Sequence, residues 1–472
     1  MAEKDEKRHM KKSINRIAFF NFLSILLLQG ISFISAPLFS RLMGTEGYGN
    51  LSSFSIWAGV VATVLSLQTN VTIANARVEF SEEEQPGYQS SAMALSLVSF
   101  AVGSALILLL GAPICAALKM ERWLLIWLLI QAFGTFGTNF LSSKFTYEFK
   151  ADKNMFLSVF IAAASMGVAL VFVLNEPVEQ RYVGRILGNA LVYGGVGALG
   201  CFWILLKGKA PFKKRYWKFC FALGFPLVFQ NLAYSILGSS DVLMLKQMAG
   251  ASDSGIYSLA FTLSGIMFTI FNALNNSWVP FFYDDMKQDR REDILCRGSR
   301  FLELFTVLSM GFVLLVREVY HLYAEESYWP GLELIPVFTA SYYVNMLCTF
   351  PVNFEIFHKK TGVVAAATVA AAAVNLVLNY VFIRLFGIAG AAVATLLAHG
   401  LQLAMHELYS RLVLGKNDYP FPLSNGIKNT VFLTGAILLF YAGRDLWLVR
   451  WALGAALGLW ELARVVKRRS LL

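Results

Sequence analysis

Charged side chains at the ends of long apolar stretches are the residues of this sequence that could do chemistry. Asp241 and Glu355 are the acids in such positions, and Arg41, Arg77 and Lys246 are the bases. A charge at bilayer depth costs on the order of 2.5–3.5 kcal/mol on insertion scales, so it should face a cavity or a partner. These five residues are therefore the first candidates for a functional site.

Each charge has a structural and a functional interpretation. Asp241 could pair with Lys246, and Arg77 could extend to lipid headgroups. Glu355 precedes Lys359 by four residues, a favourable helical spacing, and we favour that pairing. In the functional interpretation, Arg41, Lys246 and Arg77 bind an anionic substrate, with Arg41 and Lys246 at a cavity mouth. Asp241 also faces the substrate, and Asp241 and Glu355 are candidates for binding a coupling ion, H⁺ or Na⁺.

Amide side chains are also frequent in the apolar stretches, and Asn70 and Asn276 are the best candidates for a polar, sugar-compatible cavity. A single amide in a span most often hydrogen-bonds to a neighbouring helix. Their number indicates that some of them line a cavity instead. Trp57, Tyr257 and Trp278 could stack on sugar rings, although a core role is favoured.

Composition makes this chain a membrane protein. Hydrophobic residues make up 57% and charged residues 15% of its 472 positions, whereas soluble domains are about one quarter charged. Fourteen windows approach the length of about 20 residues that spans a bilayer. They centre near Leu26, Ala58, Leu97, Leu129, Ala163, Leu191, Leu227, Phe261, Val307, Phe338, Ala371, Ala394, Leu433 and Leu453. The predicted fold is an all-α polytopic membrane protein with 14 transmembrane helices.

The basic residues follow this topology. With fourteen spans, roughly three quarters of the 40 lysines and arginines fall on the side that holds both termini. Both termini are therefore predicted to be cytoplasmic, in the plasma membrane of a prokaryote. The excess of positive charge is thus not a nucleic-acid signature. The first apolar stretch exceeds signal-peptide length, so we interpret it as a retained helix.

A shift of 206 residues indicates an internal repeat. It superposes two sets of residues in the same order: Gly44, Gly49, Gly59, Asn70, Gly184 and Gly194 on Gly250, Gly255, Gly265, Asn276, Gly390 and Gly400. Glycine is retained where backbones turn or approach closely, and repeated bundles are frequent in transporters. We therefore predict two pseudo-symmetric six-helix lobes and a transporter that exposes a central cavity alternately to each side.

The predicted boundaries follow from the basic stretch Lys207–Lys218, which contains Gly, Pro and aromatic residues. Residues 1–13 form a cytoplasmic tail, 14–206 the N-lobe and 207–218 a linker that contacts anionic lipid. The C-lobe covers 219–412, and 413–472 holds two further helices and a basic tail.

No enzyme motif is found in the sequence. It contains no P-loop, no G-x-G-x-x-G, no H-E-x-x-H and no nucleophile elbow. Its five cysteines lack metal-ligand or C-x-x-C spacing. We therefore expect no catalytic residue, no metal and no bound cofactor, and any uphill transport would use an ion gradient or the membrane potential.

Three stretches resemble the polysaccharide transporter family, the Wzx-type oligosaccharide flippases. They are Ser40-Arg-Leu-Met-Gly-Thr-Glu-Gly-Tyr-Gly49, the segment from Asp241-Val-Leu-Met-Leu-Lys246 to Gly255-Ile-Tyr-Ser258, and the segment from His358-Lys-Lys-Thr-Gly362 to Phe386-Gly-Ile-Ala-Gly-Ala-Ala392. Each is loose alone, but together and in this order they are specific, and the resemblance covers nearly the whole chain.

The resemblance implies the fourteen-helix fold of the multidrug/oligosaccharidyl-lipid/polysaccharide superfamily. It also implies a function, moving a polyprenyl-diphosphate-linked glycan from the inner to the outer leaflet, with Arg41 and Lys246 as diphosphate contacts. Membrane lipids, and a glycan polymerase or glycosyltransferases, are the other expected partners. The alternatives are a cation-coupled multidrug exporter, which the basic candidates disfavour, and a flippase for a lipid-linked peptidoglycan precursor. A scaffold or a polymerase would need longer loops.

Overall fold

The computed structural model describes residues 2–414 and 419–468, and every regular element in this part of the chain is helical. The chain divides into two compact units, Met1–Ile236 and Leu237–Leu472. The division lies within one long helix, α8 (Lys214–Met248). The lobe and linker boundaries expected from the sequence stay a prediction.

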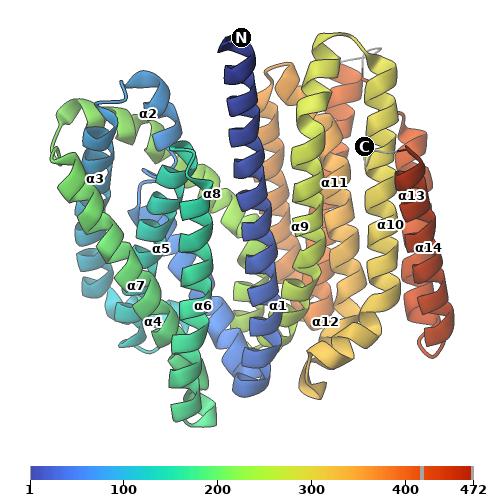
Figure 1. Ribbon diagram of the computed structural model, residues 1–472. Helices are drawn as coiled ribbons and strands as arrows, with labels where there is room; N and C mark the ends of the chain where they lie inside the picture. Colours follow the sequence, from blue (N-terminus) through green and yellow to red (C-terminus); the bar gives the residue numbers. More distant parts are fainter. Residues whose placement is uncertain (1, 415–418, 469–472) are drawn as a thin grey trace. The chain divides into compact units, whose positions relative to one another are not determined.

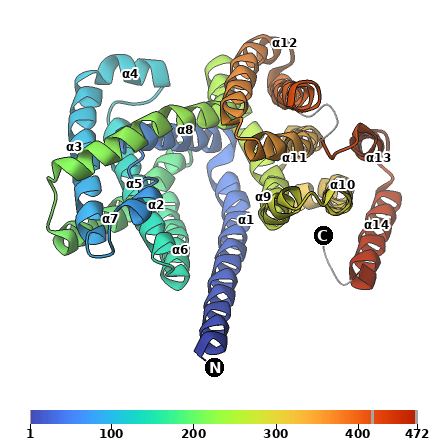
Figure 2. The same ribbon diagram turned by 90° about the horizontal axis from the view of Figure 1, so that it is seen from above.

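Unit 1 holds the first seven helices and the start of α8. They are α1 (Ala2–Leu65), α2 (Ile73–Glu79), α3 (Gln85–Leu109), α4 (Gly111–Leu118), α5 (Leu124–Tyr147), α6 (Ala151–Asn175), the 3₁₀ turn η1 (Val178–Gln180) and α7 (Arg181–Gly208). Helices α5, α6 and α7 lie side by side and form the main packing of this unit (Figures 1 and 2).

Unit 2 holds the end of α8 and the helices after it. They are α9 (Ala251–Lys287), α10 (Arg291–Tyr323), the 3₁₀ segment η2 (Glu326–Leu334), α11 (Ile335–Phe357), α12 (Thr361–Tyr409), the π-helical turn η3 (Ser410–Leu414), α13 (Leu423–Ala442) and α14 (Trp447–Arg468). Helix α14 packs along α10 (Figure 1). Ion pairs from Arg450 to Glu318, and from Arg464 to Glu303 at 2.6 Å, join the two helices.

Each predicted span centre lies in a helix, and α1 and α12 each contain two of them. Among the described residues, ten helices are long and apolar enough to cross a membrane, and these two double helices are among them. Large apolar side chains are left exposed on their outer faces, such as Leu199 at 72% and Phe156 at 71%. Such surfaces are covered by lipid in a membrane protein. The predicted all-helical polytopic fold is confirmed.

Two glycines related by the 206-residue shift make equivalent turns. Gly44 interrupts α1 with φ 67° and ψ 177°, and Gly250 precedes α9 with φ 112° and ψ 169°. Positive φ is strained for residues with a Cβ atom, which explains why both positions are glycine. Gly47 and Gly49, in the same segment, are helical and buried. A single glycine is enough because it supplies the whole change of direction.

The contact between α5 and α7 leads to a stability prediction. A Cβ atom on Gly134 would lie 2.3 Å from the carbonyl carbon of Tyr193, on the α7 backbone. Gly134→Ala should therefore force the helices apart and destabilise the protein by about 1–3 kcal/mol, the usual cost of overpacking. Thermal unfolding in detergent measures the effect. Gly195→Ala is the control, because a Cβ atom there meets nothing within 4 Å. Equal loss in both variants would contradict the prediction.

Candidate functional site

Asp241 is the centre of a buried polar cluster in unit 2. The side chain is 2% exposed and receives hydrogen bonds from two other helices. Tyr257 of α9 donates to Oδ2 at 2.5 Å, and Thr395 of α12 donates to the same oxygen at 2.7 Å. Asn379 Nδ2 donates to Oδ1 at 3.1 Å, and Ser240 Oγ lies 3.4 Å from the same oxygen. These donors compensate a carboxylate that burial alone would make unfavourable.

Two asparagines on α12, both fully buried, complete this cluster. Asn375 Oδ1 accepts from Ser240 Oγ at 3.1 Å and from Asn379 Nδ2 at 3.0 Å, and Asn375 Nδ2 donates to Thr395 at 3.2 Å. Asn379 Oδ1 is buried without a hydrogen-bond partner. Turning the Asn379 amide over would place this oxygen beside Asp241 Oδ1 and Asn375 Oδ1. Three oxygens would then converge with no donor between them, a repulsion that a bound cation or proton would relieve.

The atoms that the Asp241 cluster offers to a ligand are mostly oxygens. It combines one carboxylate with hydroxyl and amide oxygens, which are hard donors. Across residues 2–414 and 419–468, no group of three His, Cys, Asp or Glu side chains could hold a metal ion.

The acidic candidates have partners other than those expected. Asp241 is surrounded by hydroxyl and amide groups of α9 and α12. The favoured pairing of Glu355 with Lys359 is wrong. Glu355 is fully buried and bonds to His406 at 2.9 Å, whereas Lys359 is exposed beyond the end of α11 with φ 61°. The left-handed residue ends the helix, so the four-residue spacing does not apply.

The remaining candidates are distributed over both units. Lys246 is half-buried near the end of α8, and Asn276 is exposed on α9. In unit 1, Arg41 is exposed on α1, and the exposed Arg77 stacks on Phe149 with its Cζ 4.7 Å from the ring centre. The unit containing each residue is thus known, but these residues are not joined into one cluster by the contacts within either unit.

Asn70 lies in a break between α1 and α2, over residues 66–72. Leu67 and Gln68 have φ of 50° and 51°, so two consecutive non-glycine residues are left-handed. The break is stabilised by polar contacts, including Thr69 Oγ1 to Ser96 Oγ at 2.6 Å and Asn231 Nδ2 to Gln68 Oε1 at 3.0 Å. Non-helical backbone at membrane depth needs such partners.

Two arginines on α7 were not predicted. Arg181 donates to Leu42 O on α1 at 3.0 Å. Arg185 donates to Ser35 Oγ on α1 and to Ser165 O on α6, and its Cζ lies 3.9 Å from the centre of the Phe39 ring. The four-residue spacing of two arginines at the start of an apolar stretch could have identified them. They give unit 1 a group of cations beside the segment that carries Arg41.

The aromatic candidates include two core residues. Trp278 and Tyr257 are each 1% exposed, and Trp278 stacks on Phe301 with ring centres 5.6 Å apart. They are not available for stacking on a sugar, which agrees with the favoured core role.

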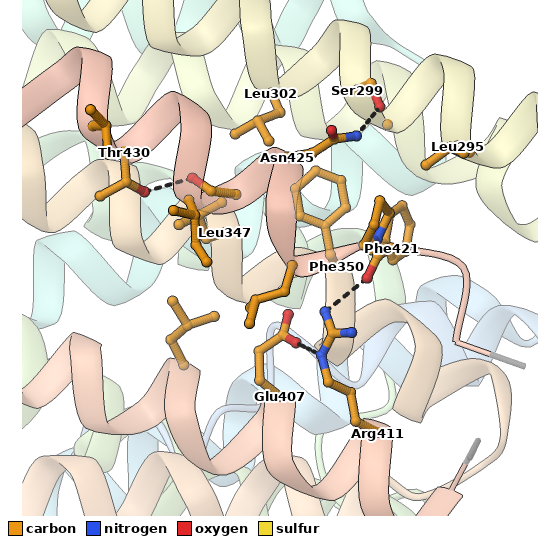
Figure 3. A pocket seen from close by; sticks show the side chains of 17 residues that line it. Leu295, Ser299, Leu302, Leu347, Phe350, Glu407, Arg411, Phe421, Asn425 and Thr430 are labelled. Atoms are coloured by element: carbon orange, nitrogen blue, oxygen red, sulfur yellow. Dashed lines mark hydrogen bonds and ion pairs between the residues drawn. The ribbon is translucent and has the colours of Figure 1, made fainter. Parts of the chain in front are cut away.

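A cavity of about 290 Å³ lies in unit 2 between α10, α11, α12 and α13 (Figure 3). Its wall is mostly aliphatic and aromatic, with Phe350 and Phe421 among its residues. The polar groups at its edge already bond to each other: Glu407 to Arg411 at 2.5 Å, and Asn425 to Ser299 at 2.9 Å. Sugar hydroxyls would lose hydrogen bonds in this cavity, so it does not suit a glycan.

Comparison with known proteins identifies the family. The family described as "Polysaccharide biosynthesis protein" matches residues 15–285, more than half of the chain. This protein belongs to that family. A protein of the Lsg locus of Haemophilus influenzae is 24% identical over 274 residues, 55% of this chain. The chain spans 63% of that relative's length, less than two thirds.

One similar relative carries a functional name. The "Probable low-salt glycan biosynthesis flippase Agl15" of Haloferax volcanii is 23% identical over 82% of this chain and 81% of its own. Among solved structures, the inward closed lipid II flippase MurJ matches 96% of this chain and 98% of its own, with a TM-score of 0.70 and 13% identity. This match shows the fold. The family and the apolar helices make the chain a multi-pass membrane protein, and the Haloferax relative and MurJ are the ones named as flippases.

The Asp241 cluster yields a binding prediction. If the site takes Na⁺, replacing choline with sodium should raise the melting temperature of the purified protein, because a ligand at one hundred times its Kd stabilises by about 2.7 kcal/mol. Asp241→Asn should abolish this sodium effect. Asp253→Asn, a half-buried acid in the first turn of α9, is the control and should respond like the wild type. A sodium effect that survives Asp241→Asn would contradict the assignment.

Proposed function

We propose that this protein is a flippase that moves a polyprenyl-diphosphate-linked oligosaccharide from the inner to the outer leaflet of a prokaryotic plasma membrane. Transport occurs by alternating access through a cationic cavity, with both termini in the cytoplasm. The observation that carries the proposal is the family match over residues 15–285 together with the relative named as a probable glycan biosynthesis flippase.

The substrate explains why a protein is needed. Each sugar hydroxyl costs roughly 4–8 kcal/mol to move into an apolar phase without hydrogen bonds, so a few hydroxyls prevent spontaneous flipping. The diphosphate adds an anionic charge that arginine and lysine recognise. Arg41 and Lys246 remain the proposed diphosphate contacts, and the cations Arg181 and Arg185 support an anion-handling role for unit 1.

We propose that the cation gradient drives transport through ion binding at Asp241. Binding of Na⁺ or H⁺ to a buried carboxylate removes its charge from the low-dielectric interior of unit 2. The carboxylate bonds to α9 and α12 and lies on α8, so the bound ion would change contacts among three helices at once. A cation gradient could in this way favour one conformation over another.

The test is a flipping assay in proteoliposomes with a fluorescent polyprenyl-diphosphate oligosaccharide. A membrane-impermeant quencher reports the leaflet in which the label lies. The wild type should move label between leaflets, and empty liposomes should not. Failure of several lipid-linked glycans to move, under both sodium and proton gradients, would contradict the proposal.

Arg41 supplies a variant for the same assay. Arg41→Gln should reduce flipping at least tenfold, because losing a charged hydrogen bond to phosphate costs about 1.5–3 kcal/mol. Lys153→Gln is the control, since Lys153 is an exposed cation on α6 of the same unit. If both variants flip at the wild-type rate, Arg41 is not a diphosphate contact.

A further inference from the structure

A second group of ionisable side chains in unit 2 lies apart from the Asp241 cluster. Glu355 of α11 and His406 of α12 are both fully buried, and Glu355 Oε2 lies 2.9 Å from His406 Nδ1. Ser410, also fully buried, begins the turn η3 and places its Oγ 3.2 Å from Glu355 Oε1. Ionisable residues at membrane depth are costly, which makes such a pair a candidate for function.

The hydrogen atoms of this group can be counted. The Ser410 hydroxyl has one hydrogen but two acceptors within reach, Glu355 Oε1 at 3.2 Å and Pro351 O at 3.4 Å. If the hydrogen goes to Pro351, the contact with Glu355 needs a proton on the carboxyl group. If it goes to Glu355, the contact needs no proton on Glu355 Oε1. The same geometry thus fits the pair with and without one extra proton.

His406 provides an independent sign that a proton can be added. Its Nε2 is buried and has no hydrogen-bond partner. When the ring is neutral and donates a hydrogen bond from Nδ1 to Glu355, the lone pair on Nε2 accepts no hydrogen bond. Protonation of the ring gives a neutral ion pair with Glu355 but leaves an N–H without an acceptor. In neither form are all polar atoms of the ring hydrogen-bonded.

Other ionisable groups surround Glu355 and His406 and contribute to the electrostatic potential at the pair. On α11, Cys348 interacts electrostatically with Glu355 and Glu407. Glu407 of α12 pairs with Arg411 of η3 and accepts from Tyr419 at 2.9 Å. Burial, followed by the Glu407 charge, raises the pKa of Tyr419 well above its usual value, so Tyr419 stays neutral.

The remaining neighbouring helices contribute charges that are already paired. His358 at the end of α11 bonds to Phe354 O at 2.9 Å. On α9 and α10, which also pack against α11, Asp285 pairs with Arg290 and Arg297. Because these neighbouring charges are already paired, Glu355 and His406 are the buried pair that can gain or lose a proton at this end of unit 2.

We propose that Glu355, His406 and Ser410 form a proton-binding site in unit 2, separate from the Asp241 cluster. The His406 imidazole lies 2.9 Å from Glu355 and fills the space that a metal cation would need beside this carboxyl group. The ligand of the site is therefore a proton. The site goes beyond the proposed function and requires no substrate. Its proton is shared between Glu355 and His406, so its binding changes both residues together and belongs to the pair.

Proton binding at this site is connected to the cavity described above. Ser410 starts a π-helical turn, a feature that often marks functional positions. The residues next to His406 and Ser410 in the chain are Glu407 and Arg411, which form an ion pair at the edge of the cavity (Figure 3). A change in the Ser410 hydrogen bond thus acts on the turn that positions Arg411.

Infrared spectroscopy of the purified full-length protein, titrated with pH, tests the proposal directly. Carboxyl bands and the ring bands of isotope-labelled histidine are followed together. We expect one step in which a buried carboxyl band and the bands of one histidine ring change together, and we expect Glu355→Gln and His406→Gln each to abolish that step in both sets of bands. Asp241→Asn should leave it unchanged. The proposal is overturned if each variant removes only its own residue's bands while the partner still titrates at the original pH.

A conservative variant guards against misfolding. Ser410→Ala keeps the ionisable pair and should shift the pH midpoint of the step while leaving it a single step. A midpoint unchanged in Ser410→Ala would contradict the role of the hydroxyl. Because these measurements use no glycan, their failure is distinct from failure of the flippase proposal. In the flipping assay, Glu355→Gln should flatten the pH profile of the rate, and an unaltered profile would contradict a role in transport.

Discussion

The structure depends on supplying a partner to each charge buried among apolar helices. In unit 1, Lys144 is 2% exposed and bonds to Gln89 and, at 2.5 Å, to Glu148. In unit 2, Arg450 is fully buried and bonds to Glu318 and to Leu314 O at 3.1 Å. An unpaired buried charge would cost several kcal/mol. These contacts therefore specify which helices pack together, a choice that apolar surfaces in lipid leave open.

The same requirement applies to the backbone. Helices satisfy their own amides and carbonyls, so a membrane chain departs from helix only where another group replaces the lost bonds. At Gly44 and Gly250 the departure is a single residue with positive φ. At residues 66–72 it is longer, and serine and threonine hydroxyls take over: Ser96 Oγ donates to Ser66 O, and Thr72 Oγ1 donates to Thr69 O. The broken segments are thus also the polar segments.

Most of the fold could be predicted from the sequence, because span length and apolarity are local properties. The window centres fall in helices, and Gly44 marks a turn as expected. The site was harder to predict because its partners are distant in the chain. Glu355 and His406 are separated by 51 positions, and Asp241 and Thr395 by 154. Local spacing therefore suggested Lys359 and Lys246 as partners, whereas helix packing brings other residues to these acids.

The 206-residue repeat relates the Arg185 contacts in unit 1 to the Asp241 cluster in unit 2. A shift of 206 places Ser35 of α1 on Asp241 of α8, and Arg185 of α7 on Ala391 of α12. In unit 1, Arg185 connects α7 to α1 through Ser35 and to α6 through Ser165 O. In unit 2, Asp241 connects α8 to both halves of α12, through Asn379 and Thr395.

Equivalent helices are thus joined around a cation in unit 1 and around an anion in unit 2. A purely structural role would be served equally well by the same charge in both units. Opposite charges instead give the units different ligand preferences, because a buried guanidinium attracts anions and a buried carboxylate attracts cations. In the proposed function, this difference would divide substrate handling and ion coupling between two copies of one helical plan.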